Sequence, residues 1–147
     1  MTKRLTGKEI ADHINKSFPE TAIRYNKTDV WITSESLSDV ANFLKENSDL
    51  DFKFLTAITA VDYIEYFELV YHILSMRRNR SIVLKTKCFG RENPTVPSVV
   101  DVWQGAELQE REIWDLMGIN FDRHPNMKRI LLWEGYPGHP LRKDFLG

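Results

Sequence analysis

The central third of the chain reads FKFLTAITAV at residues 52–61, YFELVYHILS at 66–75 and SIVLKTKC at 81–88. These three runs are rich in aromatic and β-branched residues, which favour β-strands. The links 62–65 and 76–80 are short enough for hairpins, so we expect a sheet that is at least partly antiparallel. Both faces of the middle run are largely apolar, which predicts that this strand is covered on both sides.

Three further elements are predicted on the N-terminal side of these strands. Thr6 and Glu9 have the spacing of a capping box and open a helix that ends before Pro19. Residues 21–33 contain two short alternating segments around a turn-prone stretch, which indicates a β-hairpin. Apolar residues at helical spacing then predict a second helix, from Ser36 to about residue 47.

On the C-terminal side, residues 99–103 have a short helical pattern and residues 106–117 a clearer one that ends at Gly118. The last 30 residues hold three of the six prolines and four of the seven glycines and show no regular period. They contain too many large apolar side chains for a disordered linker. We therefore divide the chain into a sheet domain, 1–117, and an extended C-terminal strap, 118–147, which docks partly on the sheet's second face and partly on another protein.

Composition excludes several classes of protein. A chain of 147 residues with 42% hydrophobic residues has the size and apolar content of one folded domain. The 20 Lys and Arg balance 21 Asp and Glu, so nucleic acid is not an expected partner. The single cysteine, Cys88, forms no internal disulfide, and the N-terminus lacks the apolar core of a signal peptide, which together indicate a reducing, cytoplasmic setting. No apolar run approaches the roughly 18 to 20 residues that span a bilayer.

One carboxylate of the helix at 106–117 has an unusual position. On a helical wheel Glu110 lies inside the apolar stripe, so its burial requires a hydrogen-bonding or cationic partner, for which Arg129 and Arg142 are the candidates. The alternative is that the Glu110 stem bends to solvent at the helix edge. Arg111 and Asp115 lie on the opposite face, where they form a surface pair four residues apart.

The sequence shows no recognisable catalytic or metal-binding motif. The four histidines and Cys88 lack metal-ligand spacing, and no phosphate-binding glycine loop or nucleophile elbow is present. A self-contained carboxylate enzyme would use Glu110, Glu112 and Asp115. Glu110 points about 140° to 160° away from the other two, however, so the three do not converge on one bond.

Several spaced blocks near the C-terminus resemble one known family. They are EREIWDLMGINF at 110–121, the pair His124-Pro125, RIL at 129–131 and PLRKDF at 140–145. In this order they are similar to the C subunit of NADH:quinone oxidoreductase, respiratory complex I, a family also called the 30 kDa subunit.

The resemblance implies a fold and a role. The fold is α/β of the α+β type: a two-layer domain with a mixed, largely antiparallel sheet plus helices, followed by a long coil along neighbouring subunits. The subunit belongs to the peripheral arm at the cytoplasmic side of the cell membrane and reaches the membrane only through the complex. It binds no cofactor; flavin, iron–sulfur clusters and quinone belong to its partners, chiefly the quinone-site D subunit and neighbouring iron–sulfur subunits.

The resemblance also assigns subunit-contact roles, with no catalytic residue among them. The positions that match the family motif are Glu110, Arg111, Glu112, Asp115, Gly118, His124, Pro125, Arg129, Pro140, Arg142, Lys143 and Asp144.

The chain departs from the family pattern at two positions. Arg123 stands where the family usually has glycine, so the tight turn that glycine allows before His124 is not expected to form in the same way. Leu108 stands where an aromatic residue is common. Related subunits of membrane-bound hydrogenases and of deazaflavin- or ferredoxin-dependent oxidoreductases share the motif, so they stay open as alternatives, as does a free-standing adaptor for an unrelated partner.

Overall fold

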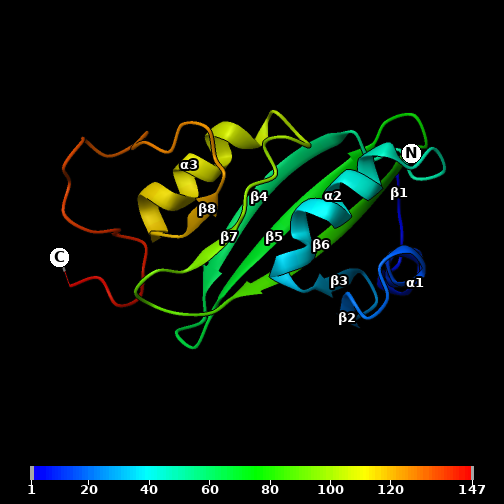
Figure 1. Cartoon of the computed structure of the whole chain (residues 1–147), viewed down its shortest axis with the longest axis horizontal. Coiled ribbons are helices and arrows are strands. Elements are labelled where there is room, and N and C mark those ends of the chain that lie inside the picture. Colours follow the sequence, from blue (N-terminus) through cyan, green and yellow to red (C-terminus); the bar gives the residue numbers. More distant parts are fainter. Residues whose placement is uncertain (1, 147) are drawn as a thin grey trace.

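The computed structural model describes residues 2–146 and contains a six-stranded mixed sheet (Figure 1). Five strands lie side by side in the order β2 (Ala22–Tyr25), β3 (Asp29–Ile32), β6 (Arg80–Cys88), β5 (Phe67–Ser75) and β4 (Phe54–Asp62). The β3–β6 pair is parallel, as is the pair of β6 with the short β1 (Lys3–Arg4), and the other pairs are antiparallel. The predicted α+β class and the mixed, largely antiparallel sheet are confirmed.

The helices follow the predicted patterns. In α1 (Gly7–Ser17) the Thr6 hydroxyl accepts a hydrogen bond from the Glu9 N–H, 3.1 Å, as a capping residue does. One 3₁₀ turn, η1 (Ser34–Ser36), precedes α2 (Leu37–Glu46). Helix α3 (Ala106–Met117) ends at Gly118, whose φ of 75° is the left-handed conformation that glycine adopts without strain.

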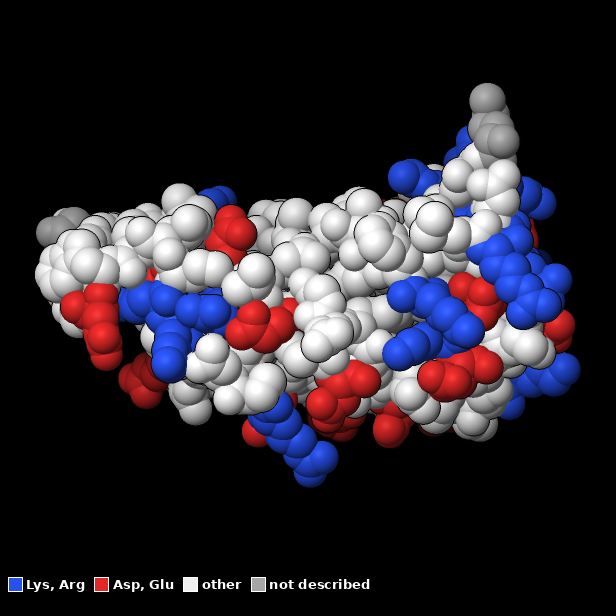
Figure 2. Space-filling model, turned by 90° about the horizontal axis from the view of Figure 1, so that it is seen from above, with Lys and Arg blue, Asp and Glu red and all other residues white. Residues whose placement is uncertain are grey.

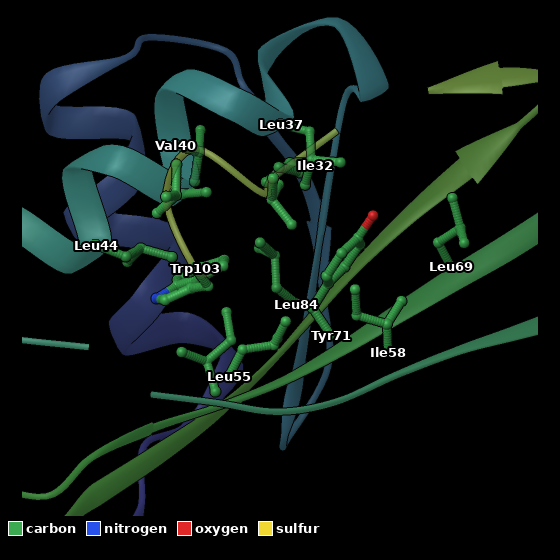
Figure 3. Close-up of a cluster of buried hydrophobic side chains, with 14 of the residues drawn as sticks. Ile32, Leu37, Val40, Leu44, Leu55, Ile58, Leu69, Tyr71, Leu84 and Trp103 are labelled. Carbon is green, nitrogen blue, oxygen red and sulfur yellow. The ribbon is translucent and has the colours of Figure 1, made fainter. Parts of the chain in front are cut away.

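The main core lies between the sheet and the helices (Figure 3). Helix α2 contributes Leu37, Val40 and Leu44, which face the fully buried Tyr71 and Leu84 of the central strands. Both α2 and α3 lie on this face of the sheet (Figure 1). They form the second layer of a two-layer domain.

The opposite face of β5 is covered only in part, so the prediction of cover on both sides is wrong for half of the strand. Glu68 is buried beside Trp31 of β3, whose indole N–H donates to its carboxylate at 2.6 Å. His72 and Leu74 on this face are only half-buried. Helices α2 and α3 both lie on the other face of the sheet (Figure 1). Side chains of the sheet itself, rather than another layer, supply the cover that exists.

The region before α3 also differs from its prediction. Residues 99–103 form a single turn, in which the Trp103 N–H donates to the Val99 oxygen at 2.8 Å, rather than the predicted short helix. A two-stranded parallel sheet joins β7 (Thr95–Pro97) to β8 (Asn120–Asp122). Ile119 and Phe121, on the C-terminal side of the predicted boundary at residue 118, are buried in the main core.

The rest of the C-terminal segment loops around the end of α3 (Figure 1). Because β8 occupies residues 120–122, the name strap is restricted from here on to residues 123–146, which contain no helix or strand. The strap contacts α3 and not the open face of the sheet, so the expectation that it covers that face is wrong: the Leu141 N–H donates to the Leu116 oxygen at 2.8 Å. No helix among the described residues is long and apolar enough to cross a membrane.

Candidate functional site

Asp115 of α3 is the point to which the first half of the strap is attached. Its side chain is fully buried, and its Oδ2 accepts hydrogen bonds from the backbone N–H groups of Ile130, Leu131 and Leu132 at 2.8–3.1 Å. Arg129 donates to Oδ1 at 2.9 Å. Asp115 does face away from the sheet, as the wheel predicts, but the expected surface position is wrong because the strap covers that side of the helix.

The pKa of Asp115 reflects this arrangement. Burial alone would raise it, but the backbone N–H groups of Leu132, Leu131 and Ile130 and the Arg129 guanidinium stabilise the charged form and hold the pKa below its ordinary value. Asp115 is therefore a carboxylate at neutral pH and holds the strap by charge as well as by hydrogen bonds.

Arg129 shapes the strap around Asp115. Besides the carboxylate, it donates to the backbone oxygens of Asp115, Tyr136 and Gly138 at 2.7–2.9 Å. Its guanidinium lies 5.1 Å from the centre of the Trp114 ring, a cation–π distance. One arginine thus joins three segments, so its predicted pairing with Glu110 is wrong.

Arg111 also binds strap backbone rather than Asp115. It donates to the carbonyl oxygens of Lys128 and Arg129 at 3.3 and 3.1 Å, and its carboxylate partner is Glu107, at 3.6 Å and four residues earlier. The predicted Arg111–Asp115 pair is absent among the described contacts because the strap N–H groups and Arg129 surround Asp115.

Glu110 lies on the other side of α3 and is fully buried, so the alternative in which its stem bends to solvent is wrong. The Ser98 hydroxyl donates to its Oε1 at 2.6 Å and the Val99 N–H to its Oε2 at 2.9 Å. Neither candidate cation contacts it. Burial raises the pKa of Glu110 to about 7, although these two hydrogen bonds favour the charged form.

His124 lies near this carboxylate without sharing a short hydrogen bond with it. Its Nε2 is 4.0 Å from Glu110 Oε1 and 3.0 Å from the Glu107 carbonyl oxygen, while its Nδ1 accepts the Asn126 N–H at 3.0 Å. The proton of a neutral ring therefore sits on Nε2 and points to the carbonyl. His124 fixes the turn that leads into the strap.

Another buried carboxylate, that of Asp62 at the end of β4, holds the far end of the strap. Arg91 binds both of its oxygens at 2.8 and 2.9 Å, and the Lys143 N–H donates to Oδ2 at 2.9 Å. The Arg91 guanidinium chiefly holds the Asp62 pKa well below its usual range. Arg91 and Arg142 both pair with Asp144, at 3.1 and 2.9 Å.

Sequence reasoning missed Asp62, Arg91 and Ser98. Arg91 lies 29 positions from Asp62 in sequence, and Ser98 lies in an irregular loop, so no helical or strand period relates either to its partner. The sequence offered one signal for this site: Asp62 is an aspartate that ends an apolar run at the start of a turn.

The other motif residues surround these anchors. Glu112 and Pro125 are exposed and Pro140 is half-buried. A Cβ atom at Gly118 would lie 2.7 Å from the His139 ring, so glycine is required there by space as well as by its positive φ. Arg123 adopts a φ of 69°, so the turn forms despite the missing glycine.

The described residues position a segment of chain, and the three carboxylates considered for an active site do not converge. Glu110 and Asp115 are buried on different sides of α3 while Glu112 is exposed, so these carboxylates do not meet. Within residues 2–146, no group of three or more His, Cys, Asp or Glu side chains is placed to hold a metal ion. The strap instead presents large apolar side chains to solvent: Leu131 is 60% exposed, Trp133 65% and Leu141 60%.

Comparison with known proteins places this geometry in a family. Residues 30–147 match the model of the 30 Kd subunit of respiratory-chain NADH dehydrogenase. The NADH-quinone oxidoreductase C subunit of Roseiflexus sp. strain RS-1 is 43% identical over 118 residues, which are 78% of this chain and 67% of that protein. The corresponding subunit of Rhizobium meliloti strain 1021 is 42% identical, over 78% of this chain and 63% of that protein. The chain thus spans about two thirds of the length of these relatives.

Two further relatives bear on assembly. The NADH-quinone oxidoreductase C/D subunit of Sulfurihydrogenibium sp. is 36% identical over 87% of this chain, which is 22% of that protein. Among solved structures, a chain of the archaeal membrane-bound sulfane sulfur reductase, a respiratory membrane complex, superposes with a TM-score of 0.76 at 27% identity. The match covers 95% of this chain and 85% of that one.

Proposed function

Because the chain belongs to the family of the 30 Kd subunit of respiratory-chain NADH dehydrogenase, we propose that it is a docking subunit in the peripheral arm of a proton-translocating NADH:quinone oxidoreductase. It supports electron transfer from NADH to quinone by holding neighbouring subunits together. It binds no cofactor itself, and flavin, iron–sulfur clusters and quinone are carried by its partners.

The observation that carries this proposal is the strap. Asp115 and Asp62 fix its two ends by charge-assisted hydrogen bonds, while Leu131, Trp133 and Leu141 point apolar surface to solvent. A segment that is already ordered loses less entropy on binding than a flexible one. Apolar and aromatic side chains on such a segment suit the core of a protein interface.

The partner we propose first is the quinone-site D subunit, with the iron–sulfur subunits next to it. The Sulfurihydrogenibium relative is named as a joined C/D subunit, which supports a place for this chain beside the quinone-site protein. We place the chain on the cytoplasmic side of the membrane, attached through the complex as a peripheral subunit.

A second candidate is the equivalent subunit of a related complex that uses another electron donor. The superposition on a chain of the archaeal sulfane sulfur reductase complex is the observation that favours it. Identity of 43% to the Roseiflexus protein against 27% to the archaeal chain supports the NADH-dependent complex as the first choice.

The test is isolation of the complex through this chain. We would tag the chain in its source organism, extract membranes with a mild detergent and identify the co-purifying proteins by mass spectrometry. We expect the quinone-site and iron–sulfur subunits, with NADH-oxidising activity in the purified material. Recovery of the chain alone would contradict the docking role, and recovery with hydrogenase or sulfur-reducing subunits would favour the second candidate.

A further inference from the structure

Strand β4 is a long free edge of the sheet, and beyond an irregularity in its pairing between Leu55 and Ala57 it carries neither charge nor proline before Asp62 to protect that edge. It ends the strand order and runs for nine residues, Phe54–Asp62. Its first eight residues include no charge and no proline, whereas natural edges commonly carry lysine, proline or a cover. Figure 2 looks onto this side of the molecule and shows a broad uncharged band between charged ends.

The backbone of Ala60 faces outward from this edge. The Tyr63 N–H donates inward to the Tyr66 oxygen at 2.9 Å, and the Ile58 N–H points outward, where the Gln109 side chain accepts it at 2.7 Å. Since backbone groups alternate along an antiparallel strand, the N–H and C=O of Ala60 point outward with those of Ile58. Within residues 2–146 they have no hydrogen-bond partner. Gln109 already occupies one position that an added strand would fill.

A groove of about 260 Å³ runs beside this edge, between β4 and α3. Its apolar lining comes from Ile58, Ala60, Ile113, Leu116, Met117 and Leu141. Among its lining residues only Glu112 is ionisable, and this carboxylate is exposed. The groove therefore combines free backbone groups, an apolar wall and one negative charge.

We propose that this edge and groove bind an extended segment of a partner subunit, which adds a strand to the sheet at Ala60. Alternate side chains of the segment are apolar and fill the groove. A lysine or arginine on it pairs with Glu112. A second copy of this chain is a poorer occupant, because its own β4 edge carries no cation between residues 54 and 61 to meet Glu112.

The proposal rests on the chain being a subunit of a complex, and hydrogen exchange tests it on the complex and on the isolated chain. An outward edge N–H exchanges quickly in the isolated chain, and a bound strand should slow the Ala60 amide by about tenfold or more in the complex. If the Ala60 amide exchanges equally fast in the complex and in the isolated chain, the added strand is wrong. Slowing in the isolated chain at high concentration would show a second copy and also overturn it.

A pair of variants provides the second measurement. Ala60→Pro removes the outward N–H without removing a ladder hydrogen bond, and proline is tolerated at such edge positions. Ala60→Ser keeps the N–H and is the matched control. We expect both variants to fold, as judged by circular dichroism, and recovery of Ala60→Pro in the complex to fall about tenfold below Ala60→Ser.

The outcomes separate this inference from the proposed function. If the wild-type chain co-purifies with its complex while Ala60→Pro is recovered equally well, the added strand is wrong and the docking role stands. If the wild-type chain co-purifies with nothing, the docking role itself fails. Glu112→Lys should also lower recovery, and unchanged recovery would contradict the cationic side chain on the partner.

Discussion

Helix α3 buries two carboxylates five residues apart, and their surroundings differ in kind. Asp115 is covered by the strap and receives three backbone N–H groups and an arginine. Glu110 faces the core side, where it receives one hydroxyl and one N–H and, within the described residues, contacts no arginine or lysine. Both side chains are completely buried, so the number and charge of the hydrogen-bond donors around each carboxyl group decide whether it is ionised. Asp115 is held as an anion, whereas Glu110 has a pKa of about 7.

The two sites therefore respond to pH with opposite sign. The lowered Asp115 pKa stabilises the fold at neutral pH, and this stabilisation is lost as the pH falls below the ordinary value near 3.8. The raised Glu110 pKa makes the folded state hold a proton that the unfolded state releases. Stability then decreases as the pH rises from 4.5 to about 7 and is level above that.

The largest effect is expected from Asp115→Asn, which keeps the size of the side chain and removes its charge. The variant leaves the Arg129 guanidinium without its carboxylate in a largely buried site. Breaking one side of such a pair costs about 3–5 kcal/mol. Denaturant unfolding measures the loss, and hydrogen exchange should show faster amides at residues 130–132.

Glu112→Gln is the matched control for Asp115→Asn, because it removes a charge from the exposed side of the same helix. We expect it to change stability by less than about 0.5 kcal/mol. A loss below about 1 kcal/mol for Asp115→Asn, with protected strap amides, would show that backbone donors alone hold the strap.

The next effect is a change of pH dependence in Glu110→Gln, which mimics the protonated side chain. The shift of the pKa from 4.5 to about 7 corresponds to roughly 3 kcal/mol between the two protonation states. The free energy of unfolding of the wild type should fall by about this amount between pH 4.5 and 8 relative to the variant. Parallel pH profiles of the two proteins would contradict the assignment, and Glu112→Gln again serves as the control.

The two carboxylates also show which features of the structure can be predicted from the sequence. The apolar runs and the capping residue Thr6 predict the strands and helices because period and local capping are properties of neighbouring residues. The wheel places Glu110 in the apolar stripe of the helix but leaves open whether its carboxylate is buried or bends to solvent. For Asp115 it gives the correct face of the helix but not the burial, because the strap that covers this face has no regular period. Ser98 and Arg91 were missed for the same reason, since irregular loops bring them to their carboxylates.

A smaller effect is expected from Ser98→Ala, which removes the hydroxyl that binds Glu110 at 2.6 Å. A hydrogen bond to a charged group contributes about 1.5–3 kcal/mol and one to a neutral group about 1 kcal/mol. The loss should therefore be greater at pH 8, where Glu110 is ionised, than at pH 5. Thermal unfolding at the two pH values measures it, and an equal loss at both would indicate that Glu110 does not change its protonation state between them.

The smallest change is expected at the entrance to the strap, where Arg123 and Gly118 both have positive φ, 69° and 75°. Glycine adopts this conformation freely, whereas another residue is strained there by about 1–2 kcal/mol. Replacing that residue with glycine relieves the strain, but glycine also gives the unfolded chain more freedom, which offsets part of the gain. Arg123→Gly should therefore raise stability by about 0.5–1 kcal/mol. Gly118→Ala, where a Cβ atom would lie 2.7 Å from His139, should lower it. If both substitutions lowered stability alike, the contacts of the Arg123 side chain would stabilise the turn by more than the strain of its positive φ destabilises it.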